Sequence, residues 1–161
     1  MKANKQGKKA WPLGKMGVIF IVAVVLVAAM TAFVQRKSAV ADIVVYKSPT
    51  CGCCRKWVEH LEDNGFSVAV YNRNDMSQIK ETMGIPRDME ACHTAKIGNY
   101  VIEGHVPADA IARLVWEQPE IKGLAVPGMP MGSPGMEGQI SENYDVLAMQ
   151  KDGQSTIYES Y

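Results

Sequence analysis

Three of the four cysteines lie within four residues of one another, at Cys51, Cys53 and Cys54. They follow an apolar run rich in β-branched residues (43–46) and precede a stretch whose apolar residues recur with the period of a helix. A hydrophobic core does not require thiols side by side, so packing explains this density poorly. The cluster therefore predicts either a soft-metal site or a redox centre at the junction of a strand and a helix.

The N-terminal part of the chain predicts export from the cytoplasm. Five lysines precede an uninterrupted apolar segment of 19 residues, 16–34, which has the length of a membrane span. The small-x-small sequence that ends at Ala41 indicates cleavage, whereas the length of the segment and the basic residues after it favour an uncleaved anchor. We expect residues 1–41 to be a signal peptide or membrane anchor. The protein would then be periplasmic, either soluble after cleavage near Ala41 or anchored in the inner membrane through residues 16–34.

The formal neutrality of the chain hides a division of charge. Seven of the 17 basic residues precede Asp42, while all 17 acidic residues lie at or after it, so residues 42–161 carry a net charge of 10 − 17 = −7. Nucleic-acid binding depends on neutralising phosphates, so no nucleic-acid partner is expected. These 120 residues are enough for one domain with a single core.

The periodicity of residues 42–116 predicts seven elements in the order β-α-β-α-β-β-α. The expected elements are a strand at 42–47, a helix from Cys54 to the Asn64-Gly65 stop, a strand at 66–71, a helix at 75–83 with Asp75 as its N-cap, a hairpin of 94–97 and 100–103, and a helix at 107–116. This order is that of an α/β, thioredoxin-like three-layer domain, in which the motif between the first strand and the first helix sits at a helix N-terminus.

The C-terminal part departs from this plan. Residues 123–138 are rich in glycine and proline and contain three methionines, so we predict a loop there. A final hairpin is expected from strands at 144–149 and 155–158, joined by a turn that contains Gly153.

The spacing of the clustered cysteines serves two kinds of chemistry. Cys51 and Cys54 form a C-x-x-C pair with Cys53 inserted. A helix N-terminus lowers the pKa of a thiol because exposed backbone N–H groups stabilise the thiolate, and a thiolate is both a redox nucleophile and a metal ligand. A third adjacent thiol competes in disulfide exchange but adds a donor to a metal site, so Cys53 favours the metal.

A second segment supplies further donors. Cys92 and His93 lie directly before the predicted hairpin, and in a thioredoxin-like fold that loop faces the motif at the first helix. Soft sulfur donors select Cu(I), so we expect Cys92 to join the three clustered cysteines in a copper site of one or several ions. The expected secondary ligands, or a lid over the site, are His93, His105, Met129, Met131 and Met136.

Three alternatives stay open at this point. Four cysteines in an oxidising compartment can form two structural disulfides, and four thiolates can bind zinc. The third alternative is a thiol–disulfide oxidoreductase with Cys51 as the nucleophile and Cys54 as the resolving thiol. His60, on the first helix, is interpreted as a surface residue rather than a ligand.

Four motifs in order resemble the CopG-type copper-resistance proteins, a periplasmic, thioredoxin-like family. The motifs are KSPTCGCC at 47–54, CHTA at 92–95, YVIEGHVP at 100–107 and GLAVPGMP at 123–130. The resemblance covers nearly all of residues 42–140 and implies copper handling under copper stress, with the cysteine cluster as the metal site. It implies copper ions as the ligand, and other periplasmic copper-handling or export proteins are the expected partners. Whether copper and thiol redox chemistry also makes the protein an enzyme is left open.

Overall fold

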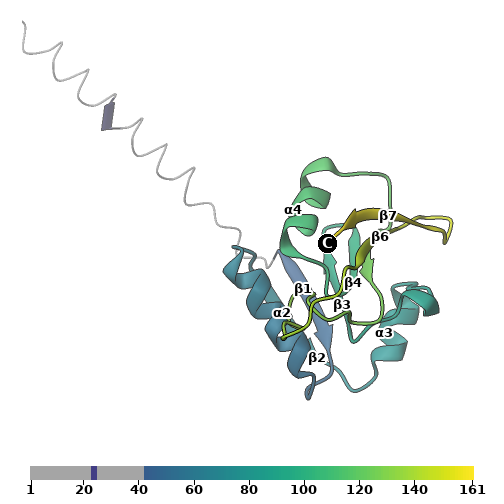
Figure 1. The fold of residues 1–161 in the computed structure, drawn as a ribbon. Coiled ribbons are helices and arrows are strands. Elements are labelled where there is room, and N and C mark those ends of the chain that lie inside the picture. The colour runs from purple at the N-terminus through teal and green to yellow at the C-terminus, as the bar shows by residue number, and fades with distance from the viewer. Residues whose placement is uncertain (1–22, 25–41) are drawn as a thin grey trace, which may run out of the picture. The chain divides into compact units, whose positions relative to one another are not determined.

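Seven strands form one mixed sheet in the part of the chain that the structure describes (Figure 1). The computed structural model describes residues 23–24 and 42–161. The strands are β1 (Ile43–Lys47), β2 (Val68–Asn72), β3 (His93–Ile97), β4 (Tyr100–Gly104), β5 (Gly123–Val126), β6 (Asp145–Met149) and β7 (Ser155–Ser160). Their order in the sheet is β2-β1-β3-β4-β5-β6-β7. The helices are α2 (Gly52–Asp63), α3 (Met76–Thr82) and α4 (Ala108–Glu117), with a short 3-10 helix, η1 (Arg87–Met89).

The predicted order of elements from the first strand to α4 is confirmed. β1 and β2 are parallel and are joined by α2, while β3 and β4 form the antiparallel hairpin about Gly98-Asn99. β3 also pairs with β1, which brings the start of β3 beside the end of β1. Local signals act as expected: the side chain of Asp75 caps α3 by accepting the Gln78 N–H at 3.1 Å.

Helices cover both faces of the sheet. Buried side chains of α2 and α4, among them Trp57 and Leu114, pack with Ile102 in the main core. Along β4 the neighbours of Ile102 point to the other face, where Val101 lies in a second buried cluster with Ile85, which follows α3, and Met89 of η1. The result is a three-layer mixed α/β domain in which Cys51, at the end of the β1–α2 connection, lies at one end of the sheet.

The interpretation of residues 123–138 as a loop throughout is wrong at its beginning. Residues 123–126 form β5, which is buried along its whole length and pairs in parallel with β4. A strand buried on both faces shows no alternation of apolar and polar residues, so its four residues gave no periodic signal. β5 also pairs with β6, and this pairing joins the predicted C-terminal hairpin to the sheet.

The predicted export segment, residues 16–34, and the cleavage site before Ala41 lie outside the described residues. Within residues 23–24 and 42–161, no helix has the length and apolar character that a membrane crossing requires.

Candidate metal centre

The clustered cysteines occupy the first turn of α2. Cys51 is the N-cap residue, and its sulfur accepts the backbone N–H of Cys54 at 3.3 Å. Cys54 is fully buried, whereas Cys51 and Cys53 are half-buried. The prediction that the motif sits at a helix N-terminus is therefore confirmed. This position gives the sulfurs the favourable backbone dipoles of the first helical turn.

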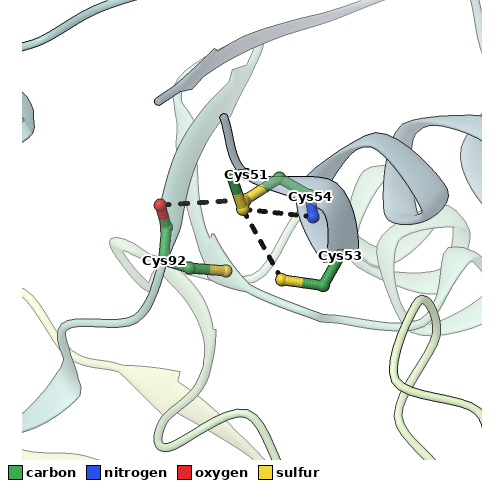
Figure 2. A group of neighbouring side chains, drawn as sticks. All are labelled: Cys51, Cys53, Cys54 and Cys92. Atoms are coloured by element: carbon green, nitrogen blue, oxygen red, sulfur yellow. Dashed lines mark hydrogen bonds between the residues drawn. A yellow bond between two sulfur atoms is a disulfide. The ribbon is translucent and has the colours of Figure 1, made fainter. Parts of the chain in front are cut away.

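Cys51 and Cys54 are joined by a disulfide, while Cys53 and Cys92 are free (Figure 2). The predicted four-thiolate site therefore requires reduction of this bond, and the alternative of two structural disulfides is wrong for this structure, in which Cys53 and Cys92 are free. The first turn of the helix brings the Cα atoms of Cys51 and Cys54 to 5.4 Å, within the range that a disulfide requires. The structure thus presents a closed C-x-x-C pair beside two thiols.

Cys92 meets this corner from the segment before β3. The sulfurs of the four cysteines all lie within 4.8 Å of one another. The sulfurs of Cys51 and Cys53 are 3.5 Å apart, and Figure 2 shows the side chains of Cys53 and Cys92 pointing toward each other. Two segments separated by 38 residues therefore place their sulfurs in one group, as the sequence predicted.

Cys92 also belongs to a second donor group, with His93 and His105. Its sulfur lies 3.3 Å from Nδ1 of His93 and 3.0 Å from Nε2 of His105. The expectation that both imidazoles lie at the site is met, and their role as ligands stays a prediction. The sulfur of Cys92 therefore belongs both to the group of four cysteines and to the group that it forms with His93 and His105.

The hydrogen bonds of His105 fix the tautomer of its ring. Nδ1 donates to the carbonyl oxygen of Pro134 at 2.6 Å. The neutral ring then has an unprotonated Nε2, which accepts the thiol proton of Cys92. Burial lowers the pKa of His105, against the smaller opposing effect of the Pro134 bond, so the neutral form is favoured. The Nε2 lone pair is therefore aimed at the sulfur, where a metal bound to Cys92 would lie.

His93 is fully buried and packs against the indole of Trp57, with ring centroids 4.2 Å apart and the ring planes tilted by 39°. Burial, together with the nearby His105, lowers the pKa of His93 well below its ordinary value. Its Nε2 has no hydrogen-bond partner among the described residues. Trp57 is held in turn by a bond of 2.8 Å from its indole nitrogen to the carbonyl oxygen of Val106. The ring of His93 is thus placed by packing against Trp57 and by the contact of its Nδ1 with the Cys92 sulfur.

The loop after β5 lies directly on the site. A Cβ atom on Gly135 would come within 2.7 Å of the Cys53 carbonyl oxygen and 3.4 Å of Nδ1 of His105. Met129 and Met131 are 37% and 36% exposed, while Met136 is half-buried beside Gly135. The contact to the site is made by the backbone of Pro134 and Gly135. The methionine ligands stay predictions.

His60 has a structural role that the sequence did not predict. It is half-buried rather than a surface residue, and its Nε2 accepts the N–H of Ala108 at 3.1 Å at the start of α4. Burial lowers the pKa of His60, which favours the unprotonated ring that this bond requires. His60 belongs to neither donor group at the cysteine cluster.

The chemistry of the donors suits a soft metal ion. Burial, reinforced by the neighbouring Cys53, raises the pKa of the Cys92 thiol to about 12, so a metal ion must displace its proton on binding. Thiolate and imidazole donors select copper or zinc over hard cations such as magnesium. Two contacts of the site were not predicted from the sequence. The Pro134 carbonyl was missed because every residue has a backbone carbonyl, and Trp57 was missed because a tryptophan on the apolar face of a helix is expected to pack in the core. The Pro134-Gly135 dipeptide indicated only a turn.

Two solved structures resemble the chain. One, named copper resistance protein copG- Form 2, is 44% identical over 74% of this chain and 96% of its own, with a TM-score of 0.71. The other, copper resistance protein copG- Form 1, is 44% identical over 74% of this chain and 95% of its own, with a TM-score of 0.70. A family model described as a protein of unknown function, DUF411, matches residues 89–136, which include Cys92 and His105. No curated protein matches the chain.

Proposed function

The chain belongs to the CopG family of copper resistance proteins, and we propose that it binds copper ions in copper resistance. The observation that carries this proposal is the meeting of four cysteine sulfurs from two distant segments within 4.8 Å. With the Cys51–Cys54 disulfide reduced, the site offers four thiolates, a donor set that favours Cu(I). The site has no need of hard oxygen ligands, and neither donor group contains a carboxylate.

The two histidines and the methionine loop complete the proposed site. Nε2 of His105 is unprotonated and faces Cys92, so it is the best placed imidazole. His93 is the second candidate because its Nδ1 also lies against that sulfur. The partly exposed thioethers of Met129 and Met131 are proposed as weaker donors along the route by which copper enters. Met136 lies beside Gly135, closer in sequence to the contact with the site.

The disulfide gives the site a redox partner for copper. Reduction of the Cys51–Cys54 bond takes two electrons and two protons and leaves two thiols. Two Cu(I) ions that become Cu(II) supply those two electrons, and the reverse reaction returns them. We propose this coupling as part of copper handling. A general disulfide exchanger is less well supported, since such an enzyme has no use for the free thiols of Cys53 and Cys92 beside the pair.

The order of elements from β1 to α4 supports a thioredoxin-like domain, because it is the order predicted for that fold and has the C-x-x-C pair at the start of the first helix. The lysine-rich flank of the apolar segment 16–34 supports an extracytoplasmic, periplasmic location, with the segment as signal peptide or anchor. Other periplasmic copper-handling or export proteins are the proposed partners.

Copper loading tests the proposal directly. The protein is reduced anaerobically, titrated with Cu(I) against a chromophoric chelator and analysed by X-ray absorption. We expect sulfur-dominated coordination, with lower stoichiometry or affinity in Cys53→Ser. Met149→Leu is the matched control, because it removes one sulfur from the second core cluster at nearly constant volume. Wild-type stoichiometry and affinity in Cys53→Ser would count against the cluster as the copper site.

A further inference from the structure

A buried polar network lies beneath the site, on the α3 side of the sheet. Lys80 of α3 forms an ion pair with Glu103 of β4, and both side chains are almost completely buried. Thr94 of β3 is fully buried between them: it donates to Oε2 of Glu103 at 2.6 Å and accepts from Nζ of Lys80 at 3.0 Å. A buried ion pair contributes little net stability on average, so its presence calls for another explanation.

The carboxylate of Glu103 holds the chain on both sides of Cys92 and His93. Its Oε1 accepts the backbone N–H of Ala91 at 2.7 Å, one residue before Cys92. Its Oε2 holds the hydroxyl of Thr94, one residue after His93. The segment between η1 and β3 has no regular backbone pairing, so the bond to Ala91 is a fixed point that the sheet does not supply.

Packing reinforces this fixed point. Gly104 ends β4 with a φ of +71°, and a Cβ atom there would lie 2.8 Å from Cβ of Ala91. The absence of a side chain lets Ala91 rest on the end of β4, next to the carboxylate that binds its N–H. The backbone beside Cys92 is therefore held by Glu103, while the Cys92 sulfur faces the other cysteines and His105.

We infer that Lys80, Glu103 and Thr94 are positioning residues for the copper site, which hold Cys92 and His93 in the place where the two donor groups meet. This inference rests on the proposed copper function. Glu103 receives three donors, from Ala91, Lys80 and Thr94, and only a carboxylate can accept all of them. Glu103→Gln removes the negative charge that pairs with the buried Lys80, and the Thr94 hydroxyl must turn from donor to acceptor to meet the amide nitrogen. The positive charge of Lys80 balances the carboxylate of Glu103.

The test compares Cu(I) affinities of reduced wild-type protein, Glu103→Gln and Thr94→Val. Partners that orient metal ligands typically change metal affinity about 10- to 100-fold when they are removed. We expect a loss in that range for Glu103→Gln and a smaller loss for Thr94→Val, which keeps the ion pair and the Ala91 bond. The sulfur-to-copper absorption should change in both. Ile111→Val, on the core face of α4, is the control for a modest loss of stability without contact to the network.

One further variant, Cys92→Ser, makes the outcomes distinct. If wild-type protein binds no copper, or if Cys92→Ser binds it as tightly as wild type, the proposed function fails. If Cys92→Ser binds weakly but folded Glu103→Gln and Thr94→Val keep wild-type affinity and spectrum, the positioning role fails while the copper function stands. If Glu103→Gln does not fold, Thr94→Val decides alone, and wild-type affinity in that variant overturns the inference.

Discussion

Replacing Gly135 with alanine tests whether the loop after β5 is held against the metal centre by close backbone contact. Gly135 has a φ of +87°, and its missing Cβ would lie 2.7 Å from the Cys53 carbonyl oxygen and 3.0 Å from the Trp57 nitrogen. Both neighbours belong to the backbone of α2, so they cannot rotate away as a flexible side chain would. The added methyl group must therefore push the loop off the helix.

The expected cost has two parts. The left-handed backbone conformation costs an alanine about 1–2 kcal/mol. Displacement of the loop also removes the Pro134 carbonyl from Nδ1 of His105, and a buried donor left without a partner costs about 1–3 kcal/mol. The free energy of unfolding of Gly135→Ala should therefore fall by about 2–5 kcal/mol.

Gly65 provides a matched control, because it has the same φ of +87° and no atom within 4 Å of its missing Cβ. Gly65→Ala should lose only the conformational part, about 1–2 kcal/mol. Both variants are unfolded in urea with the Cys51–Cys54 bond in the same redox state, and the transitions are followed by circular dichroism. Equal losses in the two variants would refute the close contact between the loop and α2.

Three other perturbations test separate parts of the structure. Trp57→Phe should lower the free energy of unfolding by about 1–3 kcal/mol, because the buried Val106 carbonyl loses its donor. The control, Trp116→Phe, should leave the free energy of unfolding nearly unchanged because Trp116 is 88% exposed. Equal losses in the two variants would contradict the role of the indole hydrogen bond. Because the pKa of His60 is lowered, its contribution to the free energy of unfolding should be complete above pH 6.5 and should decrease as the pH falls below that value. In urea titrations at several pH values, His60→Gln should lose less stability on acidification than wild type. An unchanged dependence on pH would argue against the bond between Ala108 N–H and His60 Nε2. N-terminal sequencing of cell fractions should find either a chain that starts at Asp42 in the soluble extracytoplasmic fraction or an intact N-terminus in the membrane, whereas an intact chain in the cytoplasm would disprove export.

The sequence by itself determined the local elements and the kind of chemistry. Periodicity predicted the order from β1 to α4, Asp75 predicted a helix cap, and the clustered cysteines predicted a sulfur-rich site at a helix N-terminus. These features depend on residues close together in the chain, whose backbone preferences and side-chain spacing act locally. The four motifs also predicted the family, because their order and spacing are specific.

Only the tertiary structure decided how the site is assembled. Three features of the site depend on contacts that no local pattern encodes. They are the disulfide between Cys51 and Cys54, the position of His105 Nε2 at Cys92, and the burial of Glu103 with Lys80. β5 was missed for the same reason: a short strand is identified by the partners it pairs with, and those partners lie far away in the chain. Close packing selects one arrangement from many that a linear pattern allows, and here it places the free thiols of two segments side by side.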